Sequence, residues 1–539
     1  MKTFLLSLSF FALVISASCV CLADDEGHHH EDLTQGQLGT VHFPVSCDGK
    51  VQQNFERGIA LLHSFWYSQV EKQFTVIAKD DPKCAMAHWG VAMGMWHQLW
   101  DEPDAKTIAQ GLAEVKEAEA LHPKTQREKD YIAAIGAFYS DSQKRDHHAR
   151  AVAYSDAMEG IYKRYPEDKE AAAFYALSLL ASAPEGDTTF ANRKKAASVL
   201  EVLFKEEPNH PGVAHYLIHS YDKPQLAALG LPAARRYAEI APASPHALHM
   251  PSHIFARLGL WQDDIKSNLA SIAATRQTAQ MGDSGHQFHA MDFLVYAYMQ
   301  SGREEDAEAL VEEIKTMPED RDSMYGSEYD PRTNSLSVFP ARIDLELRHW
   351  QDAAALKPVA GALPGDLAVT YWARAIGAAR SGNVKQANED VAQIESIHET
   401  LVKEKKPYFA AGVEDSRLEA MAWVNHAAGK NGEAVAALRS LAEKEEARGD
   451  EVGDIPAREM LADMLMEMKQ PTQALAEYET DLKFNPGRFD GLYGAAQSAK
   501  AAQQENKATE FYAELVKSCT GATSARPELA RAKGLVASK

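Results

Sequence analysis

Apolar residues recur at helical spacing along most of this 539-residue chain, and no stretch alternates apolar and polar positions as a half-buried strand would. A first unit runs from about Val51 to Cys84. It has small or aromatic residues where two helices would cross and a proline where the second would end: Gly58, Tyr67, Phe74 and Pro82. The same frame returns at Ala196, Pro208, Gly259, Trp261, Gly302, Trp350, Gly382, Gly429, Ala474, Pro486 and Tyr493. The pattern predicts an all-α chain of about eleven helical pairs.

Histidines repeat with one fixed period. His249 follows His215 by 34 residues, and His253 follows His219 by the same interval. That interval is the period of tetratricopeptide repeats, in which each unit is a pair of antiparallel helices. Stacked units bury a continuous core between neighbours. We therefore expect a right-handed, tetratricopeptide-like α-solenoid over residues 46–525, followed by a C-terminal tail over residues 526–539.

The first 45 residues differ from this pattern. Residues 1–23 combine one lysine, an apolar run and small residues before Asp24, as a secretory signal peptide does. Acylation at Cys19 is the alternative, although Ser16 occupies the position where a lipoprotein signal has an aliphatic residue. Residues 24–45 begin with acidic residues and histidines and are expected to form a mobile arm. No other stretch is apolar enough to cross a membrane. We expect an exported protein, periplasmic or secreted.

The charge of the chain limits the kinds of partner that it can bind, and its cysteines bear on the compartment in which it folds. The chain carries 77 acidic and 56 basic residues, a formal charge of −21. An acidic surface repels phosphate backbones, so no nucleic acid is expected as a partner. Three cysteines follow the signal peptide: Cys47, Cys84 and Cys519. Either Cys47 and Cys84 form a disulfide and leave Cys519 unpaired, or all three are small buried residues.

The helical register divides each repeat into a packing arc and a second arc. In tetratricopeptide domains the second arc, with positions 2, 5 and 9 of the first helix, lines the concave surface. We expect this groove to bind a protein or peptide ligand. The residues assigned to that ligand are His246, Asp292, Tyr296, Arg342, Trp372, Glu459 and Asp463. The residues assigned to a metal are His215, His219, His249, His253 and His289.

The histidines leave three interpretations open. In the first, imidazoles from adjacent helices converge on Zn²⁺ or Cu²⁺, with His219 and His253 as the best pair and Asp222 or Asp292 completing or orienting the shell. In the second, they hydrogen-bond a peptide or an acidic ligand and titrate near neutral pH. In the third, they record the duplication of one repeat and have no chemical role.

The expected function is thus an exported binding scaffold with a histidine-rich groove. The alternative is a metal-dependent enzyme or a metal chaperone that uses the same histidines. The sequence contains no HExxH zinc motif, nucleophile elbow or phosphate-cradling glycine loop. Pro251 lies between His249 and His253, where a missing backbone donor should kink the helix.

Long segments also resemble a widespread group of exported bacterial tetratricopeptide proteins. The segments are FERGIALLHSFWY, CAMAHWGVAMGMWHQLW, HYLIHSYD, HALHMPSHIFARLGLW, HAMDFLVYAY and IPAREML. Together they are spread over most of the chain beyond the signal peptide. The resemblance implies the helical-repeat fold and export. It implies no reaction.

Overall fold

The computed structural model describes residues 35–99, 102–184, 186–277, 284–318, 330–449, 453–522 and 524–537. The expected signal peptide and residues 24–34 lie outside these ranges. No strand occurs within the described residues, and none of their helices is both long and apolar enough to cross a membrane.

The helices up to the histidine-rich region are α1 (Gln35–Leu38), the 3-10 helix η2 (Gly49–Val51), α2 (Gln52–His63), α3 (Tyr67–Asp80), α4 (Ala85–Gly94), α5 (Ala105–Ala120), α6 (Gln126–Tyr139), α7 (His147–Arg164), α8 (Lys169–Ala181), α9 (Ala191–Glu206), α10 (Pro211–Tyr221), α11 (Ala227–Ile240), α12 (Pro245–His249) and α13 (Pro251–Arg257).

The remaining helices are α14 (Trp261–Gln277), α15 (Ser284–Gln300), α16 (Glu304–Thr316), α17 (Pro331–Glu346), α18 (Trp350–Ala355), α19 (Pro364–Arg380), α20 (Val384–Lys403), α21 (Pro407–Ala427), α22 (Asn431–Arg448), α23 (Ala457–Glu467), α24 (Pro471–Phe484), α25 (Phe489–Ala501), α26 (Glu505–Ser518) and α27 (Pro527–Ala537).

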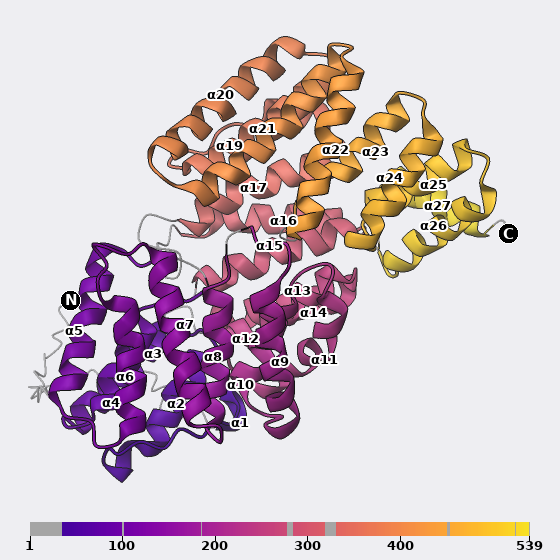
Figure 1. The fold of residues 1–539 in the computed structure, drawn as a ribbon. Helices are drawn as coiled ribbons and strands as arrows, with labels where there is room; N and C mark the ends of the chain where they lie inside the picture. The colour runs from indigo at the N-terminus through magenta and orange to yellow at the C-terminus, as the bar shows by residue number, and fades with distance from the viewer. Residues whose placement is uncertain are drawn as a thin grey trace, which may run out of the picture. The chain divides into compact units, whose positions relative to one another are not determined.

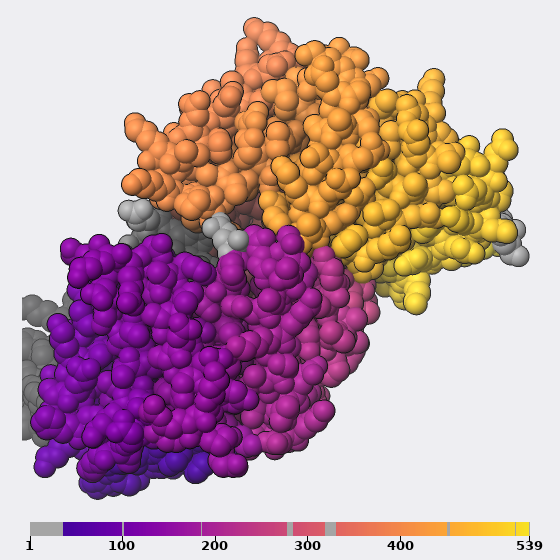
Figure 2. All heavy atoms as spheres, in the orientation of Figure 1, coloured from indigo at the N-terminus to yellow at the C-terminus, as the bar shows by residue number. Residues whose placement is uncertain are grey.

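Each helix packs mainly against its neighbours in the sequence (Figure 1). Helix α19 contacts α20 and α21, and α20 contacts α21, which is the pattern of stacked helical pairs. Figure 2 draws all heavy atoms on one face, where segments that follow one another in the chain lie against each other. The prediction of an all-α, tetratricopeptide-like solenoid is confirmed.

Both ends of the solenoid extend beyond the predicted limits. Leu38, Val41 and Phe43 are buried, and the Phe43 ring centroid lies 5.4 Å from that of Trp89, so residues 35–45 belong to the core and not to a mobile arm. At the other end, residues 527–537 form α27, which buries Leu529 against the preceding helices. A few apolar residues therefore anchor each end of the solenoid. They are too few to form a visible period in the sequence.

The cysteines adopt the paired arrangement. Cys47 and Cys84 form a disulfide that joins the segment before α2 to the start of α4. Cys519 is free and buried, and burial raises the pKa of its thiol to about 12. The bridge closes a loop at the N-terminal end of the repeats.

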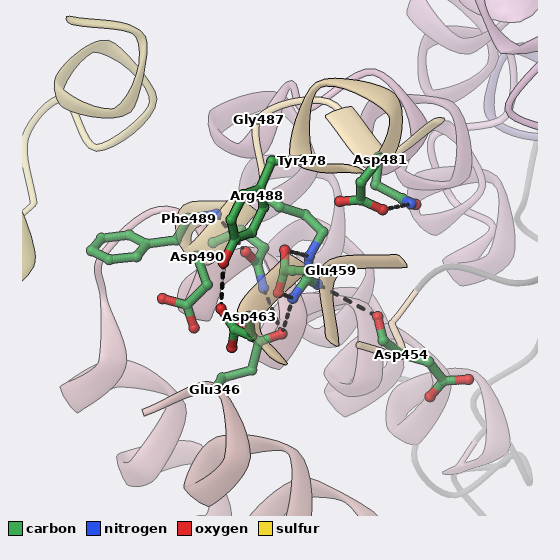
Figure 3. A network of polar contacts seen from close by, with 12 residues as sticks. Glu346, Asp454, Glu459, Asp463, Tyr478, Asp481, Gly487, Arg488, Phe489 and Asp490 are labelled. Carbon is green, nitrogen blue, oxygen red and sulfur yellow. Dashed lines mark hydrogen bonds and ion pairs between the residues drawn. The ribbon is translucent and has the colours of Figure 1, made fainter. Parts of the chain in front are cut away.

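A buried arginine connects helices that are far apart in the sequence (Figure 3). Arg488, with no exposed surface, donates to Glu459 Oε2 and Oε1 over 2.8 and 2.9 Å and to Glu346 Oε1 over 2.8 Å. Its Nη1 also donates to the Tyr296 hydroxyl over 3.1 Å. The network ties α15, α17, α23 and α25 together.

One guanidinium faces two buried carboxylates in this network. Burial raises the pKa of Glu459 to about 8, and the nearby Glu346 carboxylate adds to the rise against the pull of Arg488. Glu459 therefore binds a proton more tightly in the folded protein than in the unfolded chain. Its contribution to the free energy of unfolding is complete below its pKa of 4.5 in the unfolded chain. That contribution is lost as the pH rises through its higher pKa in the folded protein.

Replacing Glu459 with glutamine should change the pH dependence of stability. Glutamine keeps the shape and cannot lose a proton, so the variant should gain free energy of unfolding relative to the wild type as the pH rises from about 6 to about 9. Urea unfolding at both pH values measures this, with the exposed Glu443→Gln on α22 as the control. If the free energies of unfolding of Glu459→Gln and wild type differ by the same amount at both pH values, the raised pKa of Glu459 is contradicted.

Opening the disulfide should destabilise the N-terminal repeats. The bridge spans 37 residues, and restraint of the unfolded chain over such a loop is worth about 3–4 kcal/mol. Urea unfolding of Cys47→Ser with Cys84→Ser, compared with wild type, measures the loss. Thiol titration of the denatured, unreduced chain from residue 24 onward should find a single thiol, Cys519, and three thiols would refute the bridge.

Candidate functional site

Helix α10 carries the first histidine pair on a buried face. His210 caps the helix by accepting a hydrogen bond from the Val213 N–H, and Pro211 occupies its first turn. His215 and His219 lie one turn apart on the same face. Gly212 allows close packing here, because a Cβ atom at this position would lie 2.4 Å from the His63 ring on α2.

Helices α12 and α13 carry the second pair. Ser244 caps α12 by accepting from the Ala247 N–H. Met250, between the two helices, has helical dihedral angles (φ −51°, ψ −33°), so the chain continues in a helical direction. Pro251 has no N–H to donate, and the structure divides the segment there into α12 and α13, at the position where a kink was expected. His249 and His253 still face the same side, 3.0 Å apart at Nε2.

The structure groups six histidines into two clusters of three. The first cluster comprises His215, His219 and His246. Its Nε2 atoms converge, since those of His219 and His246 each lie 3.0 Å from Nε2 of His215. The second cluster comprises His249, His253 and His289 of α15. Each cluster thus joins an i, i+4 pair of one repeat to a histidine of the next repeat.

The two clusters are adjacent. The ring centroids of His219 and His253 lie 6.2 Å apart, and so do those of His246 and His249. The expected best ligand pair, His219 and His253, is therefore divided between two clusters. His286 of α15 lies beside the first cluster, with its ring centroid 5.2 Å from that of His246.

The outer nitrogens of three histidines are held by oxygen atoms. His215 Nδ1 lies 2.7 Å from the His63 carbonyl oxygen, and His249 Nδ1 lies 2.7 Å from Asn268 Oδ1. His253 Nδ1 lies 2.8 Å from Asp222 Oδ2. These oxygens accept, so the proton of each neutral ring is on Nδ1 and the lone pair is on Nε2, inside the cluster.

The Asn268 orientation is itself fixed by hydrogen bonds. Its Nδ2 donates to the Asp264 backbone oxygen over 3.1 Å and to Asp264 Oδ1 over 2.7 Å, which leaves Oδ1 to face His249. Burial raises the pKa of Asp264 well above its usual range.

The Asp222 carboxyl behaves differently. Burial would raise its pKa, but Arg257 and His253 outweigh that effect and hold the pKa well below the usual range. Asp222 is therefore a carboxylate, and His253 donates to it.

Electrostatics keep most of these imidazoles neutral. Burial, followed by the neighbouring histidines, lowers the pKa of His219, His246 and His249 well below 6.5. Burial also lowers the pKa of His215 and His289 to about 3. In the second cluster Nε2 of His249 and Nε2 of His253 lie 3.0 Å apart, a contact that a proton on one ring or a metal ion between the two rings satisfies.

Exposure and apolar contacts are distributed in the same way in both clusters. His215, His246 and His249 are buried, whereas His219, His253 and His289 are partly exposed. The Phe65 ring lies beside the first cluster, 4.3 Å from the His215 centroid. The Phe293 ring lies beside the second, 4.5 Å from the His253 centroid. Each cluster thus has an apolar wall and a side that solvent reaches.

A third group, His63, Glu170 and His210, has a structural role. Glu170 accepts from both rings, with His63 Nε2 at 2.7 Å and His210 Nε2 at 3.1 Å. Their Nδ1 atoms accept from the Tyr216 hydroxyl and the Val213 N–H. Every ring nitrogen has a hydrogen-bond partner, so this buried group positions His63, whose carbonyl holds His215.

The residues assigned to an open groove are largely interior. His246, Tyr296, Trp372 and Glu459 are buried, with Trp372 Nε1 donating to Glu419 Oε2 over 2.6 Å. These four side chains therefore lie inside the packed helices, and their assignment to a ligand surface stays a prediction.

The charged members of the predicted groove are paired with one another or with neighbours. Arg342 binds Asp292 and, at 3.2 Å, Asp454, so Asp292 does not join the histidines. Asp463 accepts from Arg348 over 3.0 Å and also binds Tyr478. The predicted groove residues are therefore divided among the first histidine cluster, the Arg488 network and separate ion pairs.

Sequence reasoning missed three contributors to the clusters. His246 was assigned to the groove, although its place three residues before His249 in a histidine-rich run was a usable signal. Asn268 and the His63 carbonyl lie on other helices, 19 and 152 residues from their partners, and no spacing indicates them.

Comparisons with known proteins add little. No family model matches the sequence, and no curated protein is similar to it. Among solved structures it is similar to a human IFIT1 dimer with m7Gppp-AAAA, at 15% identity over 80% of this chain and 90% of that chain, with a TM-score of 0.34. A monomeric IFIT1 mutant with Gppp-AAAA matches at 12% identity over 84% and 95%, with a TM-score of 0.34. Scores this low assign neither ligand nor function to this chain.

Proposed function

We propose that this protein is an exported helical-repeat scaffold that binds two transition-metal ions, one in each three-histidine cluster. The observation that carries the proposal is the convergence of Nε2 atoms at 3.0 Å, with the outer nitrogens of His215, His249 and His253 occupied by oxygen acceptors. Three imidazole nitrogens with an outer set of oriented acceptors form a typical site for Zn²⁺ or copper.

Metal binding fits the structure better than peptide recognition. A peptide would need exposed side chains at groove positions, and His246, Tyr296 and Trp372 are buried. Metal binding requires neutral imidazoles, and burial supplies them. The buried ligands and their outer hydrogen bonds also favour a resident cofactor over a chaperone, since a chaperone must release its ion.

The metal content should follow the two clusters. The purified, untagged chain from residue 24 onward should bind two equivalents of Zn²⁺ or copper by elemental analysis and calorimetry. His219→Ala and His253→Ala should each remove one equivalent, because each removes a partly exposed ligand from a different cluster. The double variant should bind neither ion.

The exposed His148→Ala on α7 is the matched control and should retain both ions. Circular dichroism checks that each variant is folded. A wild-type protein that binds neither zinc nor copper would refute the proposed function. Retention of both ions by the folded double variant would show that the ions are bound elsewhere.

Asp222, which accepts from His253 Nδ1, should affect the metal affinity of the second cluster only. Asp222→Asn keeps an acceptor but loses the charge that stabilises the oriented ring, so affinity at the second cluster should fall about 10–100-fold while the first is unchanged. Competition titration with a chelator measures both affinities. Asp263→Asn, which alters a more exposed carboxylate paired with Arg235, is the control. An equal loss at both clusters would show that Asp222 acts through the fold and not through His253.

A further inference from the structure

The two clusters offer only neutral donors. Among the described residues, no carboxylate or thiolate belongs to either histidine group. The nearest carboxylate, Asp222, is neutralised by Arg257, whose Nε lies 3.0 Å from Asp222 Oδ1. Arg193 donates to the backbone oxygen of His219 and adds a further positive charge. Asp292 is held by Arg342. The Asp222 and Asp292 carboxylates are thus each paired with an arginine, and the six histidine ligands carry no negative charge.

This charge balance distinguishes between metals. The cost of burying an ion grows with the square of its charge, so two divalent ions in adjacent buried sites are far more costly than two monovalent ones. Among metals that imidazole binds well, copper has a stable monovalent state and the highest place in the divalent affinity order. Three neutral imidazoles per ion and no anion therefore favour a pair of Cu(I) ions.

On the basis of the proposed metal sites, we infer that the resident ions are a copper pair and that the pair reacts with dioxygen. Each Cu(I) ion gives one electron, and dioxygen accepts both and becomes the peroxide dianion. The two resulting Cu(II) ions carry four positive charges, which the dianion partly offsets. Two protons from solvent convert the dianion to hydrogen peroxide when it leaves. Atoms and electrons balance without a further reactant.

The arrangement of the clusters suits this two-electron step. One Cu(I) ion supplies a single electron, so both clusters must be filled. The ring centroids of His219 and His253 lie 6.2 Å apart, so the two clusters are neighbours and a small ligand bound at one ion would lie beside the other cluster. Dioxygen is small and apolar, as are the Phe65 and Phe293 walls, and it can enter on the side where His219, His253 and His289 are partly exposed.

The test is oxygen uptake by the reconstituted protein. The chain from residue 24 onward is loaded with Cu(I) under anaerobic conditions, freed of excess copper and mixed with dissolved dioxygen. One dioxygen molecule should disappear for every two copper ions, and the X-ray absorption edge should move from Cu(I) to Cu(II). Acidification should release hydrogen peroxide in the same amount as the dioxygen consumed.

The variants separate this inference from the proposed function. Folded His219→Ala should hold one copper ion and take up dioxygen at least tenfold more slowly, whereas His148→Ala should match wild type. Two bound copper ions without oxygen uptake would overturn the inference and leave the metal sites standing. Binding of zinc but not Cu(I) would do the same. Undiminished uptake by folded His219→Ala would show that the two clusters do not act together.

Discussion

The contact on which this structure turns is the 3.0 Å approach of imidazole Nε2 atoms in its interior. His249 and His253 both hold a proton on Nδ1, so a proton or a metal ion between their Nε2 atoms satisfies this close approach. The oxygens that accept from Nδ1 of His215, His249 and His253 fix the orientation of these rings. The site is therefore pre-organised, and the free energy that holds it comes from the packing of the repeats around it.

The repeat architecture explains why there are two clusters and not one. A 34-residue period places an i, i+4 histidine pair at the same position of successive first helices. A histidine near the start of the following helix, His246 or His289, then completes each set of three. The same construction, moved along by one repeat, produces two neighbouring sites. Close approach of the helices, which Gly212 permits beside His63, buries the pairs that an open groove would expose.

The sequence predicted the features that depend on period and failed on those that depend on distant partners. Helical pairs, the shared face of His215 and His219, and the break at Pro251 follow from spacing alone. The hydrogen bonds that Tyr296 and Glu459 share with Arg488 do not, because Arg488 is 192 residues from Tyr296. Register identifies which side chains share a face. It does not indicate what covers that face.

The most direct test of this account is anomalous diffraction from crystals of the metal-loaded protein. The account predicts two anomalous peaks about 2.0–2.1 Å from imidazole nitrogens. One peak should lie among Nε2 of His215, His219 and His246, and the other among His249, His253 and His289. No peak in either cluster, with the six rings still in the positions described here, would contradict it.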